Sequence, residues 1–213
     1  RGNNGQAVFL SDTDRQLFLR LLADAALETR VVLHAYVLLD DSFRLLLTPG
    51  DGGALARLMQ SLGRRYVRVF NQAHGRSGTL WEGRFRSTVV EPAEVLLDCM
   101  VHMDLAPVRA GLASEPAAWP WSSHGVYAGQ RTQPILTPPA VYWSLGNTPF
   151  AREAAYARRV SAGLSLAEQA RLDRTLRSGW ALGTEDFLAR LQTQAGRRVL
   201  PGKPGRPRKL PEA

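Results

Sequence analysis

The segment YVLLDDSFRLLLTP, residues 36–49, decides the fold of this chain. Two apolar runs flank an Asp-Asp pair, and Asp favours tight turns, so the segment predicts a β-hairpin with its corner at that pair. Side chains alternate between the two faces of a strand, so we expect Ser42 and Arg44 on one face and Phe43 on the other. This polar pair indicates either an ordinary strand edge or a functional site.

Helical periodicity surrounds the hairpin. Apolar residues recur every three or four positions in residues 11–30, 53–75 and 93–105, which predicts three helices. Residues 79–91, TLWEGRFRSTVVE, have the pattern of two further strands joined by a bend that contains glycine. The order of these elements predicts an α+β sandwich, in which helices pack on an antiparallel sheet.

The composition divides the chain into three parts. Residues 1–146 carry the mixed helix and strand pattern, and because the chain begins with Arg rather than Met we expect an N-terminal strand to be missing from this domain. Residues 147–196 are rich in Ala, Leu and Arg and predict a helical extension. Residues 197–213, RRVLPGKPGRPRKLPEA, predict a basic, disordered tail.

Composition and charge favour a polyanionic partner. The 213 residues include 27 Lys and Arg against 19 Asp and Glu, a formal charge of +8, which favours nucleic acid. The single cysteine, Cys99, rules out an intramolecular disulfide and a multi-cysteine zinc site, and it fits a reducing cell interior. No apolar run is long enough to cross a bilayer, so we expect a cytoplasmic protein without a membrane partner. We also expect the protein to be a monomer.

Several longer pieces occur in an order typical of one family. These pieces are LHAYVLLDD, LMQSLGRRYVRVFN, GTLWEGRFRS, MDLAPVRAGL, WPWSS and GRPRK. Together they resemble the REP-associated tyrosine transposases, of the insertion-sequence-200-like, single-tyrosine HUH class, over nearly the whole chain. The resemblance implies a ferredoxin-like sandwich that binds hairpin-forming, single-stranded repeat DNA in the bacterial nucleoid. It also implies DNA cleavage that depends on Mg²⁺ or Mn²⁺.

The residues that carry this chemistry in the family are replaced here. The family holds its metal with two His on one strand face, and the matching positions are Ser42 and Arg44. The family's nucleophilic Tyr and a metal-binding Asn four residues later correspond to His102 and Ala106. A serine hydroxyl is a poor ligand, a guanidinium has no acceptor and Ala106 offers no ligand atom. The resemblance therefore predicts a DNA-binding scaffold without a metal cofactor or cleavage, in which the strand face with Ser42 and Arg44 faces the helix with His102.

Three alternatives stay open at this point. An active DNA-nicking enzyme would need Asp40 or Asp41 to recruit Mg²⁺ and His102 to act as the nucleophile. Without the family resemblance, Ser42 and Arg44 are solvent-facing strand residues and His102 is an ordinary helix histidine. An RNA-hairpin binder is the third, because a scaffold that grips a DNA stem-loop also suits an RNA one of similar shape.

Candidate nucleic-acid contacts lie in four regions. Arginines in the helix expected at 53–75 project from its exposed face toward phosphates, and GRPRK resembles an AT-hook core that enters a narrow minor groove. The segment TLWEGRFRS mixes aromatic and cationic residues that stack bases and neutralise phosphates, although its Trp81 fits a hydrophobic core equally well. The fourth region is Arg44, whose fixed positive charge we expect to replace that of the metal ion in binding a phosphate. The predicted contacts are Arg44, Arg64, Arg65, Arg68, Trp81, Arg84, Arg86, Arg206 and Arg208.

Overall fold

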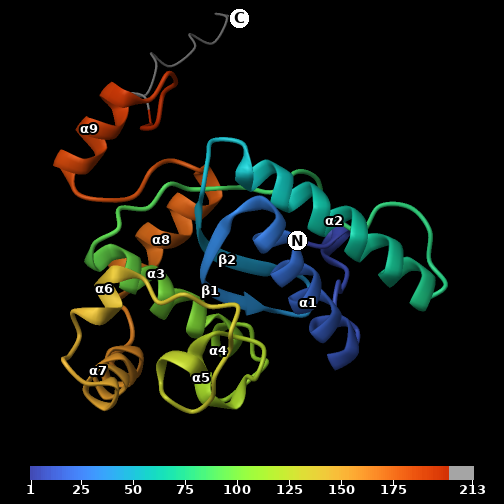
Figure 1. Ribbon diagram of the computed structural model, residues 1–213, viewed down its shortest axis with the longest axis horizontal. Helices are drawn as coiled ribbons and strands as arrows, with labels where there is room; N and C mark the ends of the chain where they lie inside the picture. Colours follow the sequence, from blue (N-terminus) through green and yellow to red (C-terminus); the bar gives the residue numbers. More distant parts are fainter. Residues whose placement is uncertain (202–213) are drawn as a thin grey trace, which may run out of the picture.

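The computed structural model describes residues 1–201 as an α+β fold, in which helices lie on both sides of a two-stranded antiparallel hairpin (Figure 1). Strand β1 spans Val31–Leu38 and β2 spans Phe43–Pro49. The backbone N–H of Leu39 donates to the carbonyl of Ser42 at 2.8 Å, which closes the turn around the Asp-Asp pair. The predicted hairpin is confirmed, and so is the α+β class with an antiparallel sheet.

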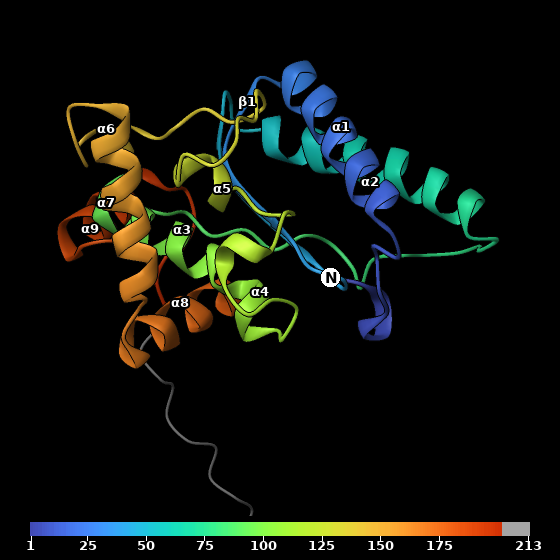
Figure 2. The ribbon, with the colours of Figure 1, turned by 90° about the horizontal axis from the view of Figure 1, so that it is seen from below.

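Helices α1 (Asp12–Thr29) and α2 (Ala54–Ala73) cover one face of the hairpin (Figure 2). Helix α1 begins at a capping box between Ser11 and Asp14, and the buried stripes of both helices follow the helical period. Phe43 packs into the core beneath them, with its ring 4.7 Å from that of Phe18. This first core consists mainly of Phe9, Phe18, Leu22, Leu33, Tyr36, Leu38, Leu58, Leu62, Tyr66 and Phe70.

Helix α3 (Glu94–Asp104) lies against the opposite face of the hairpin, where Ala35 and Val37 of β1 form a second core with it. The helix ends before Pro107, as the sequence predicts, and a short helix α4 (Ala106–Arg109) follows with this proline in its first turn. The second core consists mainly of Ala35, Val37, Leu39, Leu96, Leu97, Met100, Val101, Met103, Ala106, Tyr127, Tyr142, Tyr156 and Val160.

The remaining elements are short helices, 3₁₀ turns and the three helices of the C-terminal extension. Short helices α5 (His124–Tyr127) and α6 (Ala140–Trp143) precede the helical extension, and 3₁₀ turns span Asn3–Gly5 and Pro116–Ala118. Within residues 147–196 the chain forms α7 (Pro149–Ala162), α8 (Leu166–Ser178) and α9 (Glu185–Gln194), which confirms the predicted helical character. Helix α7 contributes to the second core, and α8 packs against Cys99 of α3, so the extension contacts the domain directly.

The two strands expected within residues 79–91 are wrong. In the described chain only isolated bridges form there, between Trp81 and Gly2 and between Val90 and Leu182. Residues 82–87 are all exposed, so they have no apolar face to bury, and Gly83 adopts a φ of 138° that breaks an extended run. This backbone pairs instead with the N-terminal residues and with the helical extension.

Two further expectations concern membrane-spanning helices and the basic tail. No helix within residues 1–201 is both long and apolar enough to cross a bilayer. Residues 202–213, with Arg206, Arg208 and most of the expected basic tail, lie outside the described part of the chain.

Candidate nucleic-acid interface

Arg44 and His102 meet between β2 and α3. The alternation of β2 turns Phe43 toward the first core and Arg44 toward α3, and Nη1 of Arg44 lies 3.1 Å from Nδ1 of His102. The His102 side chain is buried, with 1% of its surface exposed. The predicted proximity of this strand face to the helix with His102 is therefore confirmed for Arg44.

The contacts of His102 fix the protonation of its imidazole. A guanidinium only donates, so Nδ1 of His102 accepts from Arg44. Nε2 lies 3.0 Å from Oδ1 of Asp173, so it carries the hydrogen and donates to this carboxylate of α8. Burial, followed by the charges of Arg109 and Arg44, lowers the pKa of His102 to about 4 against the opposing effect of Asp173. The imidazole is neutral at physiological pH.

A second guanidinium lies on the backbone side of His102. Nη2 of Arg109, from α4, donates to the carbonyl oxygen of His102 at 2.5 Å. Burial lowers the pKa of both Arg44 and Arg109, and the charge of Asp173 partly offsets it. We call Arg44, His102, Arg109 and Asp173 the His102 cluster. It holds two cations, one carboxylate and one neutral imidazole.

The other two residues that the resemblance matched to metal ligands, Ser42 and Ala106, have different surroundings. The hydroxyl of Ser42 donates to Oδ1 of Asp41 at 2.7 Å, and Asp41 also pairs with Arg1. Asp40 forms an ion pair with Arg15 of α1. Ala106 is 3% exposed and belongs to the second apolar core. The structure thus brings Arg44 and His102 together, whereas Ser42 and Ala106 serve the turn and the core.

The His102 cluster does not fit the divalent cation that the resemblance implies. Within residues 1–201, no group of three or more His, Cys, Asp or Glu side chains is arranged to hold a metal ion. The hydrogen bond from Arg44 to His102 places a positive charge and N–H donors where a ligand lone pair would be required. What the cluster offers chemically is a fixed cation.

Helix α2 carries two arginines that are free to contact a partner. Arg64 and Arg68 are exposed, lie one turn apart and form no ion pair with the described residues. Arg65 differs, because it is bound to Asp24 at 3.0 Å and to Glu28 of α1. Arg65 therefore links α1 to α2, whereas Arg64 and Arg68 have no such partner among the described residues.

Trp81 and the arginines that follow it separate into two environments. The ring of Trp81 is partly buried and lies 5.4 Å from that of Phe43, edge to face, so this indole belongs to the border of the first core. Arg84 and Arg86 are exposed. Arg86 reaches across to the helical extension, where its Nη1 donates to the carbonyl of Arg177 at 3.4 Å.

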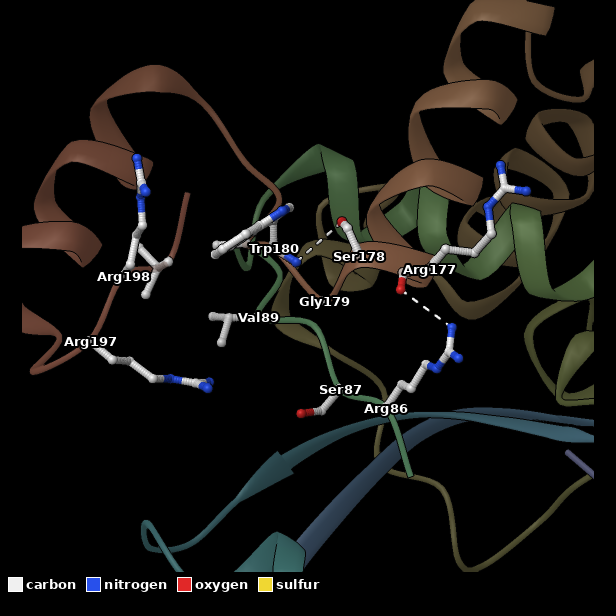
Figure 3. Close-up of a pocket in the computed structure, with 11 residues that line it drawn as sticks. Arg86, Ser87, Val89, Arg177, Ser178, Gly179, Trp180, Arg197 and Arg198 are labelled. Atoms are coloured by element: carbon white, nitrogen blue, oxygen red, sulfur yellow. Dashed lines mark hydrogen bonds between the residues drawn. The ribbon is translucent and has the colours of Figure 1, made fainter. Parts of the chain in front are cut away.

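Next to Arg86 lies a cavity of about 500 Å³, shown in Figure 3. Its walls are formed by Arg86, Ser87 and Val89 together with residues 177–181 and 197–199, with Trp180 at its side. Sequence reasoning singled out Arg86 alone from this cavity. Asp173 and Arg109 were missed as well, because no local pattern connects residues that meet only through the packing of α8 and α4 on α3.

Comparisons with protein-family models, with curated proteins and with solved structures find no match for this chain. The geometry of the described residues combines exposed guanidiniums on α2 and residues 84–86 with the partly buried guanidinium of Arg44 at the His102 cluster. Such an arrangement can neutralise phosphates.

Proposed function

We propose that this protein binds hairpin-forming DNA and does not cleave it. The observation that carries the proposal is the hydrogen bond between Arg44 and His102. These residues stand where the family that the sequence resembles has a metal ligand and a nucleophile, and here they form a fixed cation next to a neutral imidazole. Such a pair attracts a phosphate but lacks the ligand exchange on which metal-dependent cleavage depends.

Exposed arginines support the binding part of the proposal. Arg64, Arg68 and Arg84 extend from the surface and form no ion pair within residues 1–201, so each is available to a phosphate oxygen. The formal charge of +8 adds a long-range attraction for any polyanion. Phosphate contacts position a nucleic acid without reading its sequence, so the preference for a hairpin would come from the shape of the scaffold.

The hydrogen bonds of His102 speak against its use as a nucleophile. An imidazole attacks phosphorus with an unprotonated nitrogen lone pair, and the lone pair on Nδ1 accepts from Arg44. The other nitrogen carries a proton that it donates to Asp173. Asp40 and Asp41 are also occupied, by Arg15 and Arg1, so neither is free to recruit Mg²⁺. The active-enzyme alternative would require all of these contacts to break.

A binding panel tests this function. Labelled DNA hairpins with imperfect palindromic stems would be titrated beside a linear duplex and an unstructured strand of equal length and composition. We expect the hairpins to bind most tightly, and the double variant Arg64→Ala/Arg68→Ala to weaken binding. Arg158→Ala is the matched control, because this exposed arginine lies on α7, away from α2 (Figure 1).

Two results of this panel would contradict the proposal. One is equal affinity for hairpins and unstructured strands, which would show that the protein binds DNA through general charge attraction alone. The other is a clear preference for the same hairpins made of RNA, which would move the function to RNA binding.

A further inference from the structure

The cavity beside Arg86 has walls that are held in place by the backbone. The N–H of Leu182 donates to the carbonyl of Val89 at 2.8 Å, and the N–H of Glu91 donates to the carbonyl of Leu182 at 2.8 Å. On the other side, the N–H of Ala181 donates to the carbonyl of Val199 at 3.0 Å. Three segments that are distant in sequence are thus fixed side by side, so the cavity is formed before any ligand arrives.

A glycine allows two of these segments to approach. Gly179 ends α8 in the left-handed conformation with a φ of 74°, and a Cβ at this position would lie 3.3 Å from the carbonyl oxygen of Ser87. A side chain there would be strained and would press on the opposite wall. The close approach shapes the floor of the cavity, to which Val89 and Val199 contribute apolar side chains.

The charge in this cavity is positive. The guanidinium of Arg197 points toward Val89, whereas that of Arg86 points away from Val89 and Trp180, toward the carbonyl of Arg177 (Figure 3). Neither Arg86 nor Arg197 forms an ion pair with a carboxylate of residues 1–201. Arg86 uses one N–H group in its hydrogen bond, which leaves the others free. The guanidinium of Arg197 therefore lies beside the apolar wall without any acidic partner from the described chain.

Trp180 supplies a flat aromatic surface at the same place. Its indole is partly buried, lines the cavity and lies above Val89 (Figure 3). The guanidinium of Arg197 matches a phosphate group, and the indole matches a planar ring that stacks on it. A volume of about 500 Å³ falls within the range of small-molecule sites.

We propose that this cavity binds a nucleotide, with the base stacked on Trp180 and the phosphate held by Arg197. The nucleotide is either a free nucleoside phosphate or an unpaired nucleotide of a bound strand, since both present the same chemistry. The site is separate from the His102 cluster. It also stands independently of hairpin binding, because a free mononucleotide is sufficient to test it.

The test uses the full chain and thymidine monophosphate as the probe. The indole N–H resonance of Trp180, identified by its absence from the variant Trp180→Phe, should shift on titration. By calorimetry, Trp180→Ala should lower the affinity about tenfold, whereas Trp180→Phe should largely keep it because a ring remains. Arg197→Ala should also lower the affinity about tenfold through loss of a charge-assisted contact. Arg158→Ala, an exposed arginine of α7 outside this cavity, should have no effect.

Further probes identify the source of the nucleotide and the role of its base. Thymidine and inorganic phosphate should each bind at least about tenfold more weakly than the monophosphate, because each lacks one of the two contacts. A pentathymidylate that binds more tightly, and still depends on Trp180, would assign the site to a strand; equal or weaker binding would assign it to free nucleotides.

Three results would overturn the inference. They are no binding of thymidine monophosphate, phosphate binding as tight as that of the nucleotide, and unchanged affinity in both Trp180→Ala and Arg197→Ala. Failure here, together with intact hairpin binding, would reject the nucleotide site alone. Nucleotide binding without hairpin binding would reject the proposed function alone.

Discussion

Nη1 of Arg44 lies 3.1 Å from Nδ1 of His102, so a strand guanidinium and a buried helix imidazole share one hydrogen bond. The direction of this bond follows from chemistry, since arginine only donates. It makes the imidazole an acceptor on one side and, through Asp173, a donor on the other. The pair therefore behaves as a positioned cation.

Replacing Arg44 with Ala should weaken the binding of hairpin DNA by about 1 to 3 kcal/mol, because a charge-assisted contact to phosphate is lost. The affinity would be measured by fluorescence anisotropy at fixed salt. Arg158→Ala should leave it nearly unchanged. Unaltered affinity in a folded Arg44→Ala protein would show that this arginine does not contribute to DNA binding.

The lowered pKa of His102 predicts a pH-dependent stability. Between its ordinary pKa of about 6.5 and the folded value of about 4, the unfolded chain binds a proton that the folded chain does not. Stability from this group is therefore lost as the pH falls through that window. Urea unfolding from pH 7 to pH 4.5 should show a steeper loss for the wild type than for His102→Gln.

A direct check of the same pKa is the proton resonances of the His102 ring. They should stay constant from pH 8 to about pH 5, within the range in which an unperturbed histidine would titrate. A midpoint near pH 6.5 would show that the contacts with Arg44 and Asp173 do not persist in solution.

The hairpin and its flanking helices were predictable because local patterns encode them. The Asp-Asp pair marks the turn, and the helical spacing of residues such as Leu58, Leu62 and Tyr66 marks the buried face of α2. The structure of residues 79–91 was not predictable from the sequence. Their β-rich pattern finds no strand partner, and their backbone forms hydrogen bonds with residues near the N-terminus and in the helical extension. Tertiary pairing overrides propensity there.

The candidate site was predictable only in part, for a similar reason. The alternation of β2 placed Arg44 opposite the helix of His102 correctly. Asp173 reaches His102 from 71 residues away in the chain, and no spacing rule signals such a contact. The ion pairs of Arg65 were not predictable either, since its acidic partners lie on α1 and the pattern of α2 alone does not reveal them.

Ala106→Asn should destabilise the fold by about 1 to 3 kcal/mol, because an amide would be buried without a partner in the second apolar core. Ala110→Asn is the matched control, because Ala110 is exposed one turn later. Thermal or urea unfolding measures both. Equal stability of the two variants would show that position 106 accepts a polar side chain, as a metal ligand position would.

Hairpin affinity should fall steeply as salt rises, because bound phosphates release their counterions. Removing residues 202–213, which include Arg206 and Arg208, should reduce affinity for all DNA and lower the salt slope, while the preference for hairpins persists. Affinity measured at several salt concentrations decides this. A shallow slope in the full chain would argue against phosphate contacts, and loss of the hairpin preference would place recognition in residues 202–213.

The most direct test of the central claim is one labelled DNA hairpin, titrated in EDTA and in Mn²⁺ and then separated on a denaturing gel. Binding should be equal in the two conditions, because Arg44 supplies the positive charge, and the DNA should remain full length without a protein-linked band. Binding that requires Mn²⁺, or a covalent DNA adduct that disappears in His102→Ala, would contradict the account.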